Sequence, residues 1–258
     1  MFRFAANLTH LWAELPFLDR FDAAAGAGFE AVEVLQPYDI AVPEIQAALE
    51  RNDLKMLLLN APGPNYAGGD RGFAAVPGGE ARFDYDIRRA VRYARALGAG
   101  IIHVMSGVGD GAAARTTVTD NLKRAAETLP DGLILTLEPL NTRDNPGYFM
   151  CRYDLAAEVL HDVGAENVGL QYDSYHAQLI TGDALACLRD YAPLIRHVQI
   201  GDAPHRTPPG TGAIDFAALF AALEDVGYTG WVSAEYTPGD RTEKSLGWFR
   251  PEATGSCA

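Results

Sequence analysis

Four strand-like segments of the sequence end in polar residues that carry side-chain oxygen atoms: Glu138, Asp173, Gln199 and Glu235. The residues before them are rich in Val, Ile, Leu and Tyr, which indicates buried strands. A buried carboxylate is costly unless it is paired or bound to a metal ion. Three carboxylates and one amide at equivalent strand ends therefore predict oxygen ligands that converge on one cation, and thus a metal-dependent enzyme.

A second set of polar residues shares a face with these four. The set consists of Thr136, Gln171, His197 and Ser233. Each lies two residues before one of the strand-end residues, and side chains two apart point to the same side of a strand. A single acidic residue at a strand end often belongs to a solvated turn, but four polar strand ends with shared parity argue against that interpretation. The pattern favours a polar barrel interior with the active site at its mouth.

The elements that must position these residues alternate along the chain. We expect strands at residues 2–9, 31–36, 54–60, 100–106, 133–140, 168–175, 195–201 and 230–237, and helices at 17–27, 42–52, 83–97, 115–129, 153–163, 183–191, 216–226 and 241–249. Asp183 and Asp215 stand at N-cap positions, and Gly98, Gly164 and Gly227 follow helix ends.

Eight βα units in a chain of 258 residues predict an α/β fold, a (β/α)₈ TIM barrel. Alternation alone also fits a doubly wound open sheet. The sequence contains no evident linker. We therefore expect a single domain over residues 1–258, with a short C-terminal tail from about residue 250.

The composition restricts the class of protein. The net charge is −13, from 34 acidic and 21 basic residues, and such a surface disfavours binding to nucleic-acid phosphates. No apolar run reaches the ~18 residues of a membrane span, and the N-terminus lacks the features of a signal peptide. The three scattered cysteines fit a reducing compartment. We expect a cytoplasmic protein with a small-molecule substrate and no nucleic-acid or membrane partner. The sequence leaves open whether the protein forms a homo-oligomer.

The polar strand ends belong to longer motifs. These read Glu138-Pro-Leu-Asn141, Gln171-Tyr-Asp173-Ser-Tyr-His176, His197-Val-Gln199-Ile-Gly-Asp202 and Gly230-Trp-Val-Ser-Ala-Glu235-Tyr236. Together they resemble the hydroxypyruvate isomerase family, which belongs to the xylose-isomerase-like TIM barrels. Further likeness at residues 7–8, 28–33 and 103–105 extends the resemblance over nearly the whole chain.

The resemblance implies a divalent cofactor, Mg²⁺ or Mn²⁺, with four metal ligands: Glu138, Asp173, Gln199 and Glu235. Glutamine in place of histidine moves such a site away from zinc. Glu138 and Glu235 match the catalytic pair that transfers the proton, although the sequence does not say which is base and which is acid. His176 and Arg206 match substrate-binding positions. Arg206 is the candidate for the substrate carboxylate because its planar fork binds both oxygens. The alternatives without a role in substrate binding are that His176 only orients a metal ligand and that Arg206 is a solvated loop residue.

The implied reaction converts hydroxypyruvate to 2-hydroxy-3-oxopropanoate (tartronate semialdehyde) through an enediolate, in glyoxylate metabolism. A divalent cation stabilises the negative oxygen that develops in such a reaction. The alternatives are an isomerase of a four-carbon 2-oxo-tetronate, a ketose 3-epimerase, an apurinic endonuclease-like DNA repair enzyme, and a barrel that only binds a sugar acid. Epimerases of this group usually place histidine where Gln199 stands, and the endonucleases need many zinc-binding histidines, whereas this chain has six.

Other residues near the predicted site have less defined roles. His10 and Trp12 depart from the family pattern in the first loop, which helps to shape the barrel mouth. His103 and His197 are expected to be hydrogen-bonded residues of the barrel interior, and His10 and His205 are candidate substrate contacts. The Gly- and Pro-rich residues 60–72, within the longer 60–80 connection, form a candidate lid.

Overall fold

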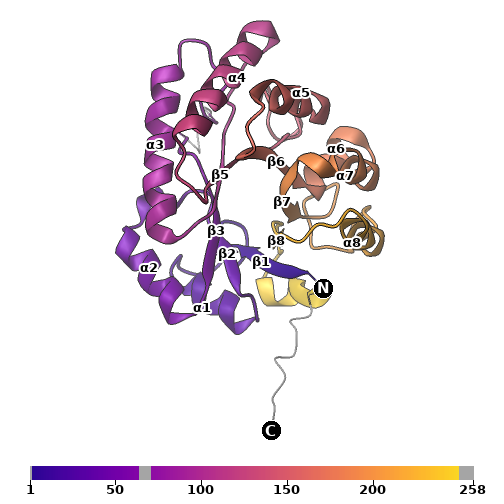
Figure 1. The fold of residues 1–258 in the computed structure, drawn as a ribbon. Helices are drawn as coiled ribbons and strands as arrows, with labels where there is room; N and C mark the ends of the chain where they lie inside the picture. Colours follow the sequence, from indigo (N-terminus) through magenta and orange to yellow (C-terminus); the bar gives the residue numbers. More distant parts are fainter. Residues whose placement is uncertain (1, 64–70, 250–258) are drawn as a thin grey trace.

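The computed structural model describes residues 2–63 and 71–249 of the chain. In this part, eight parallel strands form a closed barrel in the order β1 to β8, and β1 pairs with β8 to complete it. Figure 1 shows the helices arranged around the outside of the barrel. The predicted (β/α)₈ TIM barrel is confirmed, and an open doubly wound sheet is excluded. The expected tail from about residue 250 lies outside the described residues.

The barrel strands are short and the helices between them vary in length. The strands are β1 (Arg3–Asn7), β2 (Ala31–Glu33), β3 (Lys55–Asn60), β4 (Ile101–His103), β5 (Ile134–Leu137), β6 (Val168–Asp173), β7 (Ile195–Ile200) and β8 (Trp231–Ala234). The α-helices are α1 (Asp19–Gly26), α2 (Val42–Arg51), α3 (Glu80–Leu97), α4 (Gly111–Thr128), α5 (Tyr153–Val163), α6 (Ser174–Thr181), α7 (Ala184–Tyr191) and α8 (Phe216–Asp225). The 3₁₀ helices are η1 (Pro37–Asp39), η2 (Ala192–Leu194) and η3 (Thr242–Trp248).

The local signals that mark the helix ends act as the sequence indicated. The side chains of Asp183 and Asp215 accept hydrogen bonds from the backbone N–H groups three residues later, at 2.9 and 3.0 Å, and so cap α7 and α8. Gly98 and Gly164 end α3 and α5 with φ values of 71° and 64°, the left-handed conformation that glycine adopts without a steric penalty.

Seven of the eight strands end one to three residues earlier than expected, and the sixth is followed directly by a helix. Residues 174 and 175, assigned to a strand by their sequence, instead begin helix α6. The carboxylate of Asp173 accepts a hydrogen bond from the backbone N–H of Tyr175 at 2.8 Å, so Asp173 caps this helix as well as ending β6. The cap turns the chain away from the sheet at the barrel mouth. It thereby fixes the position of a carboxylate that the sequence marks as a metal ligand.

The two faces of the strands differ as their period-two pattern predicts. Apolar residues on the outer face are fully buried against the helices; examples are Leu135, Leu137, Leu170, Val198 and Ile200. The inner face is polar, and there the Thr136 hydroxyl donates to the Gln171 side-chain oxygen at 2.8 Å. The barrel interior is therefore a hydrogen-bonded polar layer. None of the helices in the described residues combines the length and the apolar character that crossing a membrane requires.

Candidate active site

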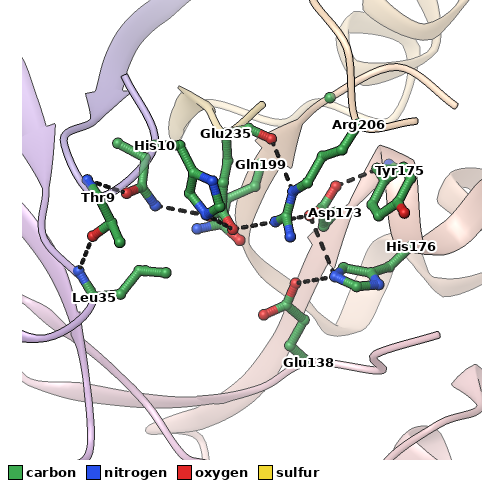
Figure 2. Close-up of polar contacts among 12 residues, drawn as sticks. Thr9, His10, Leu35, Glu138, Asp173, Tyr175, His176, Gln199, Arg206 and Glu235 are labelled. Atoms are coloured by element: carbon green, nitrogen blue, oxygen red, sulfur yellow. Dashed lines mark hydrogen bonds and ion pairs between the residues drawn. The ribbon is translucent and has the colours of Figure 1, made fainter. Parts of the chain in front are cut away.

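The four strand-end oxygen ligands predicted from the sequence gather at the carboxyl end of the barrel. Asp173 is the last residue of β6 and Gln199 lies within β7, directly opposite it in register. Glu138 and Glu235 follow the last residues of β5 and β8. All four are at most 4% exposed. Figure 2 shows their side chains converging on one region.

Arg206 reaches into this region from the loop after β7. One guanidinium nitrogen, Nη2, donates to Asp173 Oδ2 at 3.0 Å and also to Glu235 Oε1. Its Nε donates to the backbone oxygen of Glu235 at 3.3 Å. Arg206 therefore balances the charge of two predicted ligands (Figure 2), and it is not a solvated loop residue.

The carboxylates are crowded and poorly solvated, and their pKa values respond to this. Burial raises the pKa of Glu235 to about 8 and that of Asp173 to about 6, although Arg206 opposes both shifts. Burial also raises the pKa of Glu138 well above its usual range, and the negative charges of Glu235 and Asp173 add to the effect. Additional positive charge at this site would stabilise the ionised carboxylates and lower their pKa values.

The donor set fits a hard divalent cation. Ligand atoms of Glu138, Asp173 and His176 lie within 4.8 Å of one another. One carboxylate oxygen of Glu138, Oε1, is buried without a hydrogen-bond partner in the described residues. Buried polar atoms are nearly always satisfied, so an orphaned carboxylate oxygen beside two further carboxylates is the arrangement expected of a cation site.

His176 belongs to this cluster, but its hydrogen bonds favour a role other than metal ligand. Its Nδ1 accepts a hydrogen bond from the backbone N–H of Asn141 at 3.0 Å. Burial lowers the pKa of His176 well below its usual value, so the ring is neutral and carries its proton on Nε2. The Nε2 atom lies 3.9 Å from Asp173 Oδ2 and 4.0 Å from Glu138 Oε1. It is therefore placed to donate to a ligand oxygen in the pocket (Figure 2).

The amide of Gln199 is fixed by hydrogen bonds on both sides. Its Nε2 donates to Glu33 Oε2 at 2.8 Å, and its Oε1 accepts from Gln171 Nε2 at 2.7 Å. The same Gln171 nitrogen donates to Glu138 Oε2 at 3.0 Å. A carbonyl oxygen has two lone pairs, so this arrangement leaves Gln199 Oε1 one lone pair for a cation.

Two residues that the sequence interpretation gave no role complete the interior network. Asn7, at the end of β1, donates to Glu235 Oε2 at 2.8 Å and to Glu33 Oε2 at 3.3 Å. Glu33, at the end of β2, also contacts His197 Nε2, which confirms His197 as a hydrogen-bonded interior residue. A polar residue at a strand end was the signal that predicted the ligands of β5 to β8, and Asn7 and Glu33 show the same signal.

The candidate site opens into a pocket of about 220 Å³. Arg71, Arg206 and five histidine or asparagine side chains line it together with Leu35, Met105 and Leu140; these five are His10, Asn60, His103, Asn145 and His176. A larger cavity of about 560 Å³ lies on the outside, between α3 and α4, and has none of the site residues. The chemistry therefore points to the smaller pocket.

The structure distinguishes between the two other histidines that the sequence suggested as substrate contacts, His10 and His205. His10 lines the pocket, with Nε2 3.5 Å from Glu235 Oε1. His205 is exposed and does not line it. Trp12 is fully buried, packs edge-to-face on Phe29 and donates from Nε1 to Glu243, so it supports the first loop from behind.

The candidate lid falls largely on residues 64–70, which lie outside the described residues. Its far end is tied to the barrel: Gly72 pairs with Ser106 in an antiparallel bridge, and Arg71 donates to the side chain of Asn145. A Cβ at Gly72, where φ is +97°, would lie 2.1 Å from the backbone oxygen of Met105. Only glycine permits this close approach, which places Arg71 at the pocket.

Comparison with known proteins gives concordant results. A family model described as a xylose isomerase-like TIM barrel matches residues 21–252. A 2-oxo-tetronate isomerase of Cupriavidus necator is 44% identical, with 96% of this chain and 98% of the relative covered. A hydroxypyruvate isomerase of Escherichia coli is 40% identical, with 97% and 99% covered. A crystal structure described as an AP endonuclease, family 2, from Brucella melitensis is 41% identical, with a TM-score of 0.94 and 98% and 99% covered.

Proposed function

This chain belongs to the xylose isomerase-like TIM-barrel family and is an isomerase, and we propose that it isomerises small hydroxy-oxo acids, with hydroxypyruvate converted to 2-hydroxy-3-oxopropanoate (tartronate semialdehyde). The observation that carries this proposal is the buried group of Glu138, Asp173 and Glu235 beside Arg206, next to a pocket of about 220 Å³ that Glu138, Glu235 and Arg206 line. The carboxylates supply proton transfer and cation binding, the arginine supplies recognition of an acid, and the volume suits a molecule of few carbons.

The residues Glu138, Asp173, Gln199 and Glu235 would hold one divalent cation, Mg²⁺ or Mn²⁺. Their oxygen donors match the preference of these ions. When bound, such a cation stabilises the negative charge that develops on the substrate oxygens in an enediolate. It would also replace the positive charge that Arg206 gives to Asp173 and Glu235 in the structure.

Proton transfer between the two reacting carbons falls to Glu138 and Glu235. One takes the proton from the hydroxyl-bearing carbon as general base, and the other delivers a proton to the neighbouring carbon. The hydroxyl proton passes to the former carbonyl oxygen, and proton exchange with solvent restores the two glutamates. Burial raises the pKa values of both groups, and the negative charges of neighbouring carboxylates add to the effect. A base whose pKa is raised toward neutrality binds the proton more strongly and still ionises at working pH.

Arg206 and His176 are proposed to bind the substrate. Once a cation shares the charge of Asp173 and Glu235, the Arg206 fork is free to pair with the substrate carboxylate. His176, held neutral with Nε2–H toward the carboxylate cluster, donates to the carbonyl or hydroxyl oxygen of the reacting carbons. Both residues thereby orient the acid so that its reacting carbons lie between Glu138 and Glu235.

A turnover panel tests the proposal. The purified protein is incubated with hydroxypyruvate, 2-oxo-tetronate, a ketose and abasic-site DNA, each with Mg²⁺, Mn²⁺ or Zn²⁺, and the products are resolved by chiral chromatography or gel. We expect isomerisation of the acids with Mg²⁺ or Mn²⁺ and no reaction of the ketose or the DNA. Epimerisation of the ketose or cleavage of the DNA, with the acids unchanged, would refute the proposal.

A further inference from the structure

Several buried polar atoms around the pocket have no partner. In the described residues, seven buried side-chain nitrogen or oxygen atoms make no hydrogen bond, and three of them belong to pocket-lining residues: Asn60 Oδ1, His103 Nε2 and Glu138 Oε1. The Glu138 oxygen is accounted for by the proposed cation. Asn60 and His103 are 3% and 2% exposed and have no role in the chemistry described above.

These two residues form one unit of the barrel wall. Asn60 ends β3, His103 ends β4, and they are direct neighbours in the strand register. The Asn60 amide nitrogen donates to Met105 Sδ at 3.6 Å, which leaves the amide oxygen as the unpaired atom. His103 Nδ1 lies 3.4 Å from Glu138 Oε2. With the proposed cation bound, the Glu138 carboxylate is ionised and only accepts; the proton of a neutral His103 ring then sits on Nδ1, and Nε2 is an acceptor.

The wall therefore offers two unpaired acceptors, and this selects a class of ligand group. Two acceptors repel a carboxylate and a carbonyl, which are themselves acceptors. A hydroxyl group has a donor and satisfies one of them directly. The wall is suited to a hydroxyl and unsuited to the acid end of the substrate.

The barrel geometry says which hydroxyl this is. In a closed barrel of eight strands, β3 lies opposite β7 and β4 lies opposite β8. Arg206, the proposed carboxylate partner, follows β7, and Glu235 follows β8. With the carboxylate at Arg206 and the reacting carbons between the glutamates, the far end of the acid meets Asn60 and His103. Hydroxypyruvate has no carbon beyond its reacting pair, whereas a four-carbon 2-oxo acid carries a terminal CH₂OH there.

We propose that Asn60 and His103 form a subsite for the terminal hydroxyl of a four-carbon 2-oxo acid and so set a preference for that acid over hydroxypyruvate. The subsite rests on the proposed function, because its position follows from the carboxylate and reacting carbons assigned there. It makes Asn60 a specificity-determining residue. The preference is for 2-oxo-tetronate over the three-carbon acid.

The test is the substitution Asn60→Leu, which keeps the shape of the side chain and removes its acceptor. We expect kcat/KM for 2-oxo-tetronate to fall about 10- to 100-fold, and kcat/KM for hydroxypyruvate to change less than about threefold, the typical scatter of a neutral change. Because the lost oxygen has no partner in the protein, the midpoint of thermal unfolding should not fall. Thr119→Val is the matched control, since Thr119 Oγ1 is also buried and unpaired but lies on α4 outside the pocket.

Two outcomes overturn the subsite. Equal losses for both acids would place Asn60 at a part of the substrate that they share, and no loss for either would mean that its oxygen serves only water. A binding measurement keeps the proposals separable: with Mg²⁺ present, calorimetry compares the unreactive acids D-erythronate and D-glycerate. The subsite predicts about tenfold tighter binding of erythronate to the unaltered protein and no preference in Asn60→Leu. Absent turnover of both oxo acids would refute the proposed function, whereas equal binding of the two unreactive acids would refute the subsite.

Discussion

The two halves of the barrel carry different side chains at the carboxyl ends of their strands, although every strand has a polar residue there. The strands β5 to β8 present carboxylates and one amide at their carboxyl ends, and Arg206 and His176 lie among them. The strands β1 to β4 end in Asn7, Glu33, Asn60 and His103, of which only one is acidic. The second half therefore concentrates negative charge where a cation and protons are handled. The first half supplies mostly neutral hydrogen-bonding groups.

The difference separates reaction from recognition within one small pocket. Asn60 and His103 have unpaired acceptors on the β3 and β4 side. In contrast, Asn7 is hydrogen-bonded to Glu235, and Glu33 is hydrogen-bonded to Gln199. The first half thus acts in two ways: through β3 and β4 on the substrate, and through β1 and β2 on the residues of the second half. Substitutions in each half should fail in different ways.

The largest effect is expected from the two glutamates of the second half. Glu138→Gln or Glu235→Gln removes a proton-transferring group and should lower kcat by roughly 10³-fold or more, within the usual worth of a general base. The fold, followed by circular dichroism, should persist. Glu158→Gln is the control, because Glu158 is an exposed glutamate paired with Arg115 on the outer surface. Near-normal kcat in either site variant would remove that glutamate from the mechanism.

A smaller effect is expected when a hydrogen bond between the first half and the second half of the barrel is removed. Glu33→Gln replaces the acceptor of Gln199 and Asn7 with a group that also donates, so the Gln199 amide is no longer fixed. Loss of such a supporting contact should weaken Mn²⁺ binding by about 10- to 100-fold, measured by titration. Glu30→Gln, an exposed position close by in the same segment, is the control. Unchanged Mn²⁺ affinity would show that the two halves are independent.

The crowded carboxylates predict a pH dependence of stability in protein treated with chelator. Burial raises the pKa of Glu235 to about 8, so between its ordinary value of 4.5 and 8 the folded state keeps a proton that the unfolded state releases. That contribution to stability is complete below pH 4.5 and is lost as pH rises through 8.

The histidines set the useful window for this measurement. Burial lowers the pKa values of His10 and His103 to about 3, so their contribution grows as pH rises to 6.5 and is then constant. From pH 6.5 to 8 the unfolding midpoint of the chelated protein should therefore fall, and Mg²⁺ should reduce the fall. Glu235→Gln should make the fall smaller, because the amide does not titrate. A midpoint that rises over this window would contradict the crowding of carboxylates.

The contrast also explains how far the sequence alone could be interpreted. Glu138, Asp173, Gln199 and Glu235 were identifiable because each follows an apolar run and shares its parity with a second polar residue. The same rule applies to Asn60 and His103, but β4 has only three residues and β3 has no polar partner two positions earlier, so the signal is weak.

Other features depend on distance in space. The pairing of Arg206 with Asp173 and Glu235 joins residues 33 and 29 positions apart, which no local pattern encodes. The start of α6 was misassigned because Tyr175 favours strands, whereas the cap provided by Asp173 decided the outcome. The family and the closed barrel were predicted correctly and are confirmed. The role of each site residue stays a prediction for the experiments above.

The central claim is that oxygen atoms of the second half hold one divalent ion. Crystals of the protein soaked in Mn²⁺ test it directly by anomalous scattering, with Asp173→Asn crystals as the comparison. The account predicts one strong Mn²⁺ peak per chain, coordinated by Glu138, Asp173, Gln199 and Glu235, and its loss or marked weakening in the variant. A barrel mouth without Mn²⁺ at saturating concentration, or Mn²⁺ bound only to the outer surface, would contradict it.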